Sequence, residues 1–441
     1  MLNGSDFFST HHSAGGRNET KTKTENCFRR AIQKIMSNDK LSVALFGFGC
    51  VGQGLYDVLN HSEVFQADIA RICVKDPTKK RTVNQSLITY DKEDILSRND
   101  IDVVVEMITD TDEAYAIVSR ALANGVNVVS ASKKMLATYF GELHELQEKH
   151  GAALIYEGSA GGSIPIVRTL EEYYDNELLS SIRGILNGTT NYILTRMELE
   201  GRDYGDVLSD AQASGFAEAD PWSDVAGYDT LYKTCLLSIH AFGLILKPEE
   251  VLNLGIQNIS FDDIRYAREK GLRIRLVGYA AKAGDKFRIY VLPQFVKADD
   301  ELFKVQYEYN GIEVEGAFSC KQTFTGKGAG SHPTGSAVLS DISALTYNYK
   351  YAYKKLNKLR ALRTSQGISG NDFSALLDKD FTLRLYIRFA DKAELEILDI
   401  RHIEEEYRSP GMNFIIAEVG FRSLYALRDN YSQKLFVSVI S

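Results

Sequence analysis

The chain has 441 residues, of which 44% are hydrophobic and 25% are charged, and its formal net charge at pH 7 is −8. This composition is typical of a globular protein with two to three domains. The acidic balance argues against a nucleic-acid-binding protein, and no apolar run approaches the roughly 20 residues that a membrane span requires.

Residues 1–40 are predicted to be a polar N-terminal extension, to which we assign no function. They carry no apolar segment of the kind found in secretory signals. Residues 27–36 could make a short amphipathic helix within it. The folded domains are expected to begin at residue 41.

The five cysteines are scattered along the chain, without CxxC spacing and without a cluster of histidines nearby. They are Cys27, Cys50, Cys73, Cys235 and Cys320. This pattern predicts reduced structural thiols and therefore a cytoplasmic protein.

Residues 41–150 alternate between apolar runs and helical patterns. Residues 40–60 are predicted to form a strand, a tight turn and a helix. Further strands are expected at 67–76, 101–108 and 126–132, and further helices at 111–125 and 139–151. Strands that alternate with helices are typical of a doubly wound parallel sheet. This segment is therefore predicted to be an α/β, Rossmann-type, dinucleotide-binding domain.

Residues 151–320 are predicted to form a mixed α+β domain for catalysis and dimerisation. Residues 178–197 read as strand, turn and helix, and residues 262–282 as a helix that leads into a strand. Strand-rich sequence then continues to residue 332, with Asn310–Gly311 as a hairpin turn. Residues 321–345 are expected to complete the first domain.

The C-terminal part is predicted to contain a helical linker and a small separate module. Residues 336–363 read as helical, and the linker proper is placed at 346–379. Residues 380–441 are predicted to form a ferredoxin-like module with strands at 381–389, 412–421 and 435–441 and a helix at 423–431.

A glycine-rich turn follows the first predicted strand and opens the first predicted helix. It consists of Gly47, Phe48, Gly49, Cys50, Val51 and Gly52. In such a GxGxxG turn the first glycine allows the bend, the second admits a pyrophosphate, and the third lets helix and strand pack closely. This setting predicts dinucleotide binding; the alternative is a strand–helix turn without a ligand.

The end of the second predicted strand bears on the choice of cofactor. An acid at this place favours a ribose 2′-hydroxyl, whereas a basic residue accommodates a 2′-phosphate. Lys75 and Asp76 are adjacent here, and Lys79, Lys80 and Arg81 follow. The basic residues favour NADP, with NAD as the alternative.

An acidic segment precedes a single lysine in the middle of the chain. Asp229 and Lys233 are spaced i,i+4, so their side chains share one face of a helix. The simple alternative is an exposed helix ion pair. Leu236, Leu237 and His240 continue that face, however, which indicates that it points inward. Burial lowers the pKa of a lysine, the property that a proton-transferring lysine needs.

The chain resembles homoserine dehydrogenases over about residues 41–345. The signature positions are Ala211, Gly215, Phe216, Ala217, Asp220, Pro221, Asp224, Val225, Gly227, Asp229 and Lys233. The stretches "VVSASKKMLA", "YEGSAGGSIPI", "GILNGTTNYIL" and "GKGAGSHPTGSAVLSDI" are also similar to the family and occur in the same order.

The resemblance implies an NAD(P)-dependent oxidoreductase that interconverts L-aspartate 4-semialdehyde and L-homoserine in threonine and methionine biosynthesis. It implies that Lys233 transfers the proton, with Asp229 beside it, and that Lys133 is a second catalytic lysine. Glu218 is similar to the acid that receives the substrate's amino group. Asp224 resembles a carboxylate that binds substrate or orients the lysine.

The resemblance also implies the remaining ligands and the assembly. Gly215 and Gly330 match backbone positions that approach the dinucleotide, and Thr109 and Ser130 belong to the expected cofactor-binding set. A monovalent cation, sodium, is expected at Glu157, Ala160, Gly162 and Ile164. The family's middle domain mediates pairing, so a homodimer is expected.

Two positions depart from the family pattern. Ser132 stands where the family usually has Asn before its first catalytic lysine, so Lys134 could stand in for Lys133. Asp110 lies where a glycine-rich loop is common, and its charge could repel phosphate. The rival readings are a non-catalytic dinucleotide-sensing regulatory protein and a dehydrogenase of a related amino acid.

The C-terminal module stands where longer family members carry an ACT domain that binds a feedback amino acid. This module has "FADKAE" in place of the usual Asp-x-Pro-Gly turn after its first strand. We therefore predict that threonine at saturating concentration changes homoserine oxidation little. Strong inhibition in a steady-state assay would contradict this.

Overall fold

The computed structural model describes residues 40–176, 178–368, 370–431 and 435–440. The predicted N-terminal helix at 27–36 lies outside the described residues. In the described part, no helix is both long enough and apolar enough to cross a bilayer. All four described cysteines are free thiols.

The first layer is a six-stranded sheet in which every strand pair is parallel. Its order is β3-β2-β1-β4-β5-β6, the doubly wound order in which a dinucleotide binds beside the first strand. The strands are β1 (Leu41–Phe46), β2 (Ala67–Cys73), β3 (Ile88–Thr89), β4 (Val103–Glu106), β5 (Asn127–Ser130) and β6 (Leu154–Ile155). The predicted Rossmann-type sheet is confirmed.

Helices connect these strands and cover the sheet with their apolar faces. They are α2 (Cys50–His61), α3 (Glu93–Leu96), α4 (Thr111–Ala123) and α5 (Lys133–His150). The interiors of β1 and β4 are buried from Val43 to Phe46 and from Val103 to Glu106, as expected for strands covered on both faces. Helix α5 begins at Lys133, six residues before the helix expected at 139–151.

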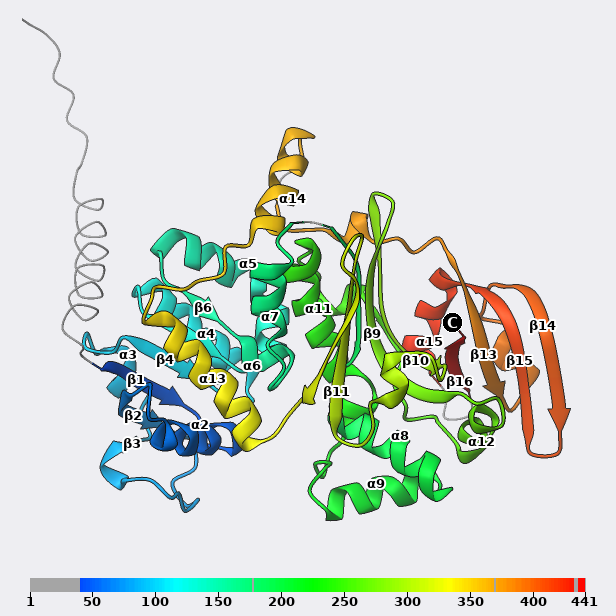
Figure 1. Cartoon of the computed structure of the whole chain (residues 1–441), viewed down its shortest axis with the longest axis horizontal. Helices are drawn as coiled ribbons and strands as arrows, with labels where there is room; N and C mark the ends of the chain where they lie inside the picture. The colour runs from blue at the N-terminus through cyan, green and yellow to red at the C-terminus, as the bar shows by residue number, and fades with distance from the viewer. Residues whose placement is uncertain (1–39, 177, 369, 432–434, 441) are drawn as a thin grey trace, which may run out of the picture.

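The second layer is a ten-stranded mixed sheet that runs through the rest of the chain (Figure 1). Its order is β12-β11-β7-β9-β10-β16-β13-β15-β14, with β8 paired to β10. The strands of the middle region are β7 (Leu179–Ile185), β8 (Leu252–Asn253), β9 (Arg273–Ala283), β10 (Lys286–Val296), β11 (Tyr309–Gly316) and β12 (Cys320–Lys327). The helices and short turns of this region are α6 (Glu157–Ala160), α7 (Ile166–Arg168), α8 (Gly188–Glu200), α9 (Tyr204–Ala213), α10 (Trp222–Val225), α11 (Tyr228–Phe242), η3 (Pro248–Glu250) and α12 (Phe261–Glu269).

The hairpin turn expected at Asn310–Gly311 is wrong. Both residues lie inside β11, and the turn to β12 follows Gly316. The Asn310 side chain is buried and donates to the carbonyl of Leu186 at 2.9 Å. Asn-Gly is a frequent turn pair. Here, however, Asn310 forms a buried hydrogen bond to Leu186, and Gly311 provides a position without a side chain inside the strand.

Helix α13 (Ser331–Leu345) returns to the first layer and packs on α2, as Figure 1 shows in yellow against blue. The single helical stretch expected at 336–363 is wrong, because residues 349–353 are not helical and α14 (Lys354–Ser365) begins after them. The domain boundaries proposed from the sequence stay a prediction.

The C-terminal module is not separate, which corrects the sequence-based expectation. Its strands are β13 (Thr382–Phe389), β14 (Ile400–Ser409), β15 (Met412–Gly420) and β16 (Phe436–Ile440), and its helix is α15 (Tyr425–Asn430). Strand β16 pairs in parallel with β10 at Gln294–Val439, so the module extends the ten-stranded mixed sheet. The order β16-β13-β15-β14 is the ferredoxin-like order, with a short 3-10 turn at Lys392–Leu395 where the first helix is expected. Strand β14, rich in charge and exposed, was missed.

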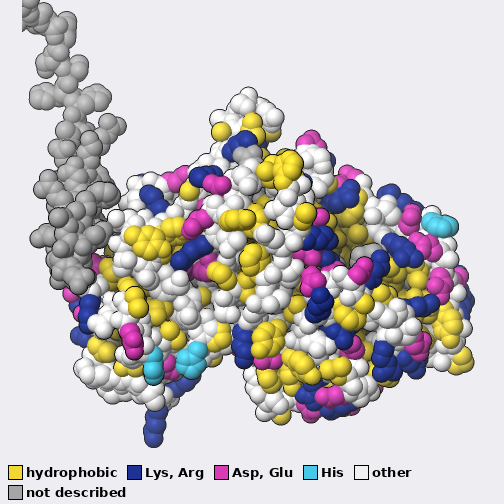
Figure 2. All heavy atoms as spheres, viewed as in Figure 1, with side chains coloured by type: hydrophobic (Ala, Val, Ile, Leu, Met, Phe, Trp, Pro, Cys, Tyr) yellow, Lys and Arg dark blue, Asp and Glu magenta, His cyan; other side chains and the backbone are white. Residues whose placement is uncertain are grey.

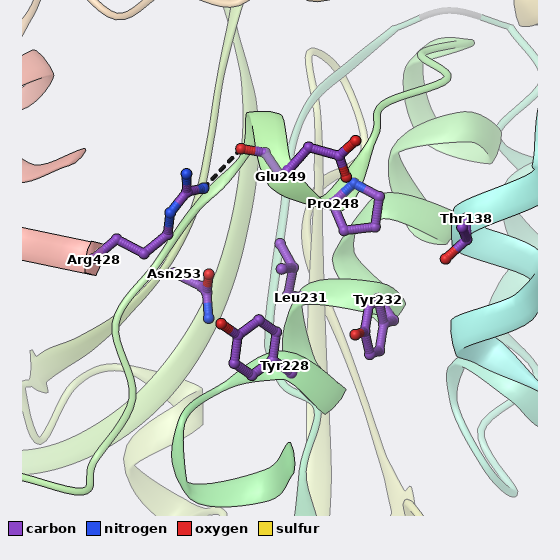
Figure 3. Close-up of a pocket in the computed structure, with 8 residues that line it drawn as sticks. All are labelled: Thr138, Tyr228, Leu231, Tyr232, Pro248, Glu249, Asn253 and Arg428. Carbon is purple, nitrogen blue, oxygen red and sulfur yellow. Dashed lines mark hydrogen bonds between the residues drawn. The ribbon is translucent and has the colours of Figure 1, made fainter. Parts of the chain in front are cut away.

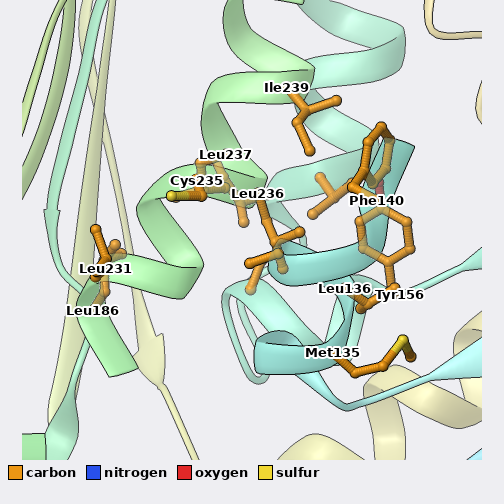
Figure 4. Close-up of a cluster of buried hydrophobic side chains, with 14 of the residues drawn as sticks. Met135, Leu136, Phe140, Tyr156, Leu186, Leu231, Cys235, Leu236, Leu237 and Ile239 are labelled. Atoms are coloured by element: carbon orange, nitrogen blue, oxygen red, sulfur yellow. The ribbon is translucent and has the colours of Figure 1, made fainter. Parts of the chain in front are cut away.

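A buried apolar cluster joins the two layers (Figure 4). Leu136 and Phe140 of α5 face Leu236 and Ile239 of α11, and all four side chains are at most 3% exposed. This packing fixes the first half of α5 against the second half of α11. On the visible surface, acidic and basic side chains are interspersed (Figure 2).

Gly54 of α2 tests the contact between α2 and α13. A Cβ at this position would lie 2.0 Å from the backbone oxygen of Ser331. We predict that Gly54→Ala lowers the free energy of unfolding by about 1–3 kcal/mol through overpacking. Gly205→Ala in α9 is the matched control, because nothing lies within 4 Å and the helix should gain about 0.5–1 kcal/mol. Urea denaturation that ranks the two variants equally would contradict this packing.

Candidate active site

Two lysines from different layers meet at one carboxylate. Lys133 Nζ lies 2.7 Å from Asp229 Oδ1, and Lys233 Nζ lies 2.8 Å from Asp229 Oδ2. The i,i+4 spacing on α11 places Lys233 above Asp229, whereas Lys133 reaches them from the first residue of α5. The sequence predicted these three residues, and the structure brings them together. Lys134, the alternative to Lys133, is exposed.

The two lysines differ in burial. The side chain of Lys233 is 6% exposed, whereas that of Lys133 is 39% exposed. Two donor hydrogens of Lys233 are directed at Asp229 and at the carbonyl of Leu186, 2.7 Å away. An ammonium has three hydrogens, so one remains for a further acceptor.

The electrostatics separate the lysines further. Attraction to Asp229 raises the pKa of Lys133 above its ordinary value. Burial lowers the pKa of Lys233, and the neighbouring charge of Lys133 lowers it further, although Asp229 opposes both effects. Burial alone would raise the pKa of Asp229, but the charges of both lysines hold it well below its usual range. Asp229 is therefore ionised, and Lys233 releases a proton more readily than an ordinary lysine.

Asn187 organises the acids, and no role was expected for it from the sequence. Its Oδ1 accepts from Thr190 N at 2.8 Å, so its Nδ2 is directed at the carboxylates. That group donates to Asp224 at 2.7 Å and to Asp229 at 2.9 Å. The one available signal was the "LNGTT" start of α8, where Asn is a frequent N-cap.

The two other predicted substrate acids lie around this cluster. Asp224 is partly buried, and burial together with the neighbouring Asp229 raises its pKa. Glu218 is exposed, yet close enough for its charge to contribute to the raised pKa of Lys133. These acids can attract a cationic substrate group to the lysines.

The glycine-rich turn has the shape that a pyrophosphate needs. Gly47 has φ +95°, and a Cβ there would lie 2.8 Å from the backbone oxygen of Met107. A Cβ on Gly52 would lie 2.9 Å from the oxygen of Gly47, so the third glycine serves close packing. At Gly49, which precedes α2, nothing lies within 4 Å, so the backbone is open to a ligand.

The remaining residues of the expected cofactor set stand at or after the carboxyl ends of β1, β2, β4 and β5, except for Gly215 and Gly330, which lie outside the parallel sheet. Gly215 has φ +77° with open space beside it, and Gly330 precedes α13. Phe48 is buried, Val51 is partly buried, and Cys50, Lys75 and Thr109 are exposed. The hydroxyl of Ser130 is buried and already engaged, because it donates to Glu106 at 2.7 Å.

The two positions that depart from the family pattern both have defined partners. Asp110 caps α4 by accepting from Glu113 N at 3.1 Å. Ser132 Oγ lies 2.7 Å from Glu106 Oε1 and 2.7 Å from the carbonyl of Ile108. The loop before Lys133 is therefore anchored without the usual asparagine.

The residues of the expected cation site lie in α6 and the following loop. The buried Glu157 carboxylate accepts from the backbone nitrogens of Val167 and Arg168 at 2.7 and 2.9 Å. Burial, with the charge of Asp341, raises the pKa of Glu157 to about 7. Ala160 and Ile164 are also buried, and the carbonyl of Ile164 accepts from Ile166 N. Among the described residues, no cluster of three or more His, Cys, Asp or Glu side chains is placed to hold a metal ion.

A cleft of about 240 Å³ separates the beginning of α11 from the C-terminal module (Figure 3). Tyr228 and Tyr232, which precede Asp229 and Lys233, line one side. Arg428 of α15 lines the other and donates to the backbone oxygen of Glu249 at 2.7 Å. The module thus approaches α11 within one turn of Asp229.

Comparisons with known proteins agree over most of the chain. Residues 47–157 match the family model of the homoserine dehydrogenase NAD-binding domain, and residues 165–343 match that of homoserine dehydrogenase. The homoserine dehydrogenase of Bacillus subtilis is 34% identical over 76% of each chain, and that of Mycobacterium bovis is 30% identical over 85% of this chain and 90% of its own.

Solved structures give the same result. A homoserine dehydrogenase from Thiobacillus denitrificans has a TM-score of 0.74 at 26% identity, covering 91% of this chain and 98% of its own. A hyperthermophilic archaeal homoserine dehydrogenase, solved in complex with NADPH, has a TM-score of 0.62 at 25% identity and covers 71% of this chain and 99% of its own.

Asn187→Asp tests how the acids are organised. The substitution keeps the acceptor for Thr190 N but replaces the two donor hydrogens by a charged oxygen. We predict that kcat/KM with homoserine falls about tenfold to a hundredfold, since bonds to charged groups contribute about 1.5–3 kcal/mol. Asn124→Asp, at the end of α4, is the control for the same chemical change outside the site. Equal kcat/KM values for the two variants would show that the hydrogen bonds from Asn187 to Asp224 and Asp229 are dispensable.

Proposed function

The chain belongs to the homoserine dehydrogenase family, and we propose that Lys133, Asp229 and Lys233 form its proton-transfer site. It is an NAD(P)-dependent oxidoreductase that interconverts L-aspartate 4-semialdehyde and L-homoserine, in the biosynthesis of threonine and methionine. Family membership favours this enzyme over the non-catalytic dinucleotide sensor.

The observation that carries the proposal is the shared carboxylate of Asp229. In the reductive direction the ammonium of Lys233 donates a proton to the nascent alkoxide, using the hydrogen that Leu186 and Asp229 leave available. In the oxidative direction neutral Lys233 accepts the hydroxyl proton. Asp229 stabilises the charge on either lysine, and the side chain of Lys133 is the more exposed of the two.

The acids around the lysines are proposed to position the substrate. Homoserine carries an ammonium group, which a carboxylate attracts, and the resemblance assigns this contact to Glu218. Asp224 is held by Asn187 beside Asp229 and contributes a second negative charge. The ammonium then lies near the acids while the terminal oxygen lies near the lysines.

The nicotinamide cofactor supplies or accepts the hydride when it is bound. The residues present fit a dinucleotide, because the open backbone at Gly49 and the first amides of α2 form a cradle that a larger side chain would narrow. Gly47, Gly52, Gly215 and Gly330 are proposed to shape the remainder of that cradle.

NADP is proposed as the preferred cofactor. One oxygen of Asp76, Oδ1, accepts from the nitrogen and the hydroxyl of Thr78, at 2.8 and 2.6 Å, which uses part of the acceptor capacity that a ribose would need. Lys75 is exposed beside it and can meet a 2′-phosphate. The archaeal relative solved with NADPH supports this choice.

A monovalent cation at Glu157, Ala160, Gly162 and Ile164 stays a proposal. A carboxylate offers about four lone-pair positions, so the two backbone donors on Glu157 leave capacity for a cation. Backbone carbonyls complete an all-oxygen donor set, which suits a hard cation.

The homodimer rests on the resemblance alone, and the cytoplasmic location on the scattered cysteines.

Substitution of the lysines tests the proton-transfer site. We predict that Lys233→Met reduces homoserine-dependent NADP reduction at least about a hundredfold, in the range of lost general acid–base catalysis, while cofactor binding persists. Lys133→Met should also lose activity, whereas Lys134→Met, at the exposed neighbour, is the matched control. Full activity of Lys233→Met would remove the assignment.

The pH dependence follows from the lowered pKa of Lys233. Oxidation needs the neutral amine, so its rate should rise with pH and level off below pH 10.5, the ordinary lysine value. Reduction needs the ammonium, so its rate should fall over the same interval. The assignment would be contradicted if kcat/KM for oxidation did not rise, or kcat/KM for reduction did not fall, over this pH interval.

A further inference from the structure

Glu106 is a fully buried carboxyl group at the end of β4 that the proposed reaction does not use. Its Oε1 lies 2.7 Å from the backbone nitrogen of Ile108 and 2.7 Å from Ser132 Oγ, and its Oε2 lies 2.7 Å from Ser130 Oγ. Every partner is neutral, and in the described part of the chain Glu106 forms no ion pair. A buried carboxylate without a cation is costly.

The hydrogen count at Ser132 decides the protonation state of Glu106. Ser132 Oγ lies 2.7 Å from two oxygens, Glu106 Oε1 and the carbonyl oxygen of Ile108. A hydroxyl has one proton and can donate to only one of them. If Glu106 were ionised, the other short contact would join two acceptors with no hydrogen between them.

A proton on Glu106 Oε1 removes this conflict. Glu106 then donates to Ser132 Oγ, and Ser132 donates to the carbonyl of Ile108. Oε1 still accepts from Ile108 N, and Oε2 still accepts from the hydroxyl of Ser130. All the short contacts become hydrogen bonds, and no charge remains buried. Burial raises the pKa of Glu106 and so favours the same protonated form.

The network lies directly before the catalytic lysine. Ser132 is the N-cap of α5, a position where a serine hydroxyl usually accepts from the helix backbone, but it makes no such bond here. Its side chain is instead directed at Glu106, and its nitrogen donates to Ser130 Oγ at 3.1 Å. The next residue is Lys133, whose Nζ must reach Asp229.

We propose that Glu106 is a positioning residue, protonated at neutral pH, which holds through Ser132 the loop that presents Lys133 to Asp229. The proposal deepens the proposed function and rests on it for the role of Lys133. The charged side chains on the adjoining elements face elsewhere: Lys133 pairs with Asp229, Lys134 is exposed, and Asp110 caps α4. Ionisation of Glu106 at high pH would break one of the two contacts of Ser132 and loosen the loop.

Infrared difference spectroscopy of the full chain tests the protonation directly. The spectrum of the parent protein minus that of Glu106→Gln at pH 7 should contain the carbonyl stretch of a protonated carboxylic acid. The other buried acids, which are Glu157, Asp229, Asp263, Glu313 and Asp341, are present in both proteins and cancel. Absence of this band from the difference at pH 7 would overturn the proposal.

Ser132→Asn is the decisive variant, because an amide supplies two donor hydrogens. It can serve Glu106 Oε1 and the carbonyl of Ile108 together while the carboxyl group is ionised. We expect the acid band to disappear at neutral pH in this variant, or to titrate at clearly lower pH than in the parent. A band with the parent's pH dependence would overturn the role of the single serine proton. This comparison needs no Glu106 variant and so remains available if Glu106→Gln does not fold.

Turnover gives the second readout. Ser132→Ala should lower kcat about tenfold with little change in KM for the cofactor, and Ser132→Asn should restore it. Ser119→Ala, on the surface of α4, controls for the loss of a hydroxyl. Unchanged kcat in Ser132→Ala would overturn the positioning role. Because the infrared measurement needs no turnover, its failure and that of the proposed function can be told apart.

Discussion

The carboxylate of Asp229 holds together two positive charges that come from different parts of the chain. Lys133 begins a helix of the parallel-sheet layer, and Lys233 lies inside a helix that packs on the mixed sheet. Either lysine alone could form an ion pair with Asp229. Because both lysines share this one carboxylate, the more buried Lys233 has less negative charge to balance its own. Burial, together with the charge of Lys133, therefore lowers the pKa of Lys233 and makes it suitable for proton transfer. Much of the surrounding structure keeps this arrangement in place.

Support for the site comes from both layers. The apolar contact between α5 and α11 packs the two helices together (Figure 4). Asn187 holds the acids Asp224 and Asp229 together. The C-terminal module continues the same sheet through β16 and approaches α11 across the cleft of Figure 3. Because the module and the catalytic region share one sheet, substitutions at β10–β16 are expected to affect both.

The parts predicted well from the sequence are those with a local signal. The strand–glycine–helix pattern at residues 40–60 needs only neighbouring residues, and so does the i,i+4 pair on α11. Asn310–Gly311 misled because its local turn preference is overridden by a buried tether to Leu186. Strand β14 was missed because it is an exposed edge strand without apolar alternation. Asn187 and Glu106 depend on side chains distant in sequence, which no pattern could bring together.

The most direct measurement is the titration of the two lysines by nitrogen NMR of protein labelled at the lysine side chains. Lys133→Met and Lys233→Met would assign the two signals. The shared carboxylate predicts that Lys233 titrates below the ordinary lysine pKa of 10.5 and that Lys133 titrates above it. Two lysines that titrate together at the ordinary value would contradict the account, because neither would then be tuned by burial and by Asp229.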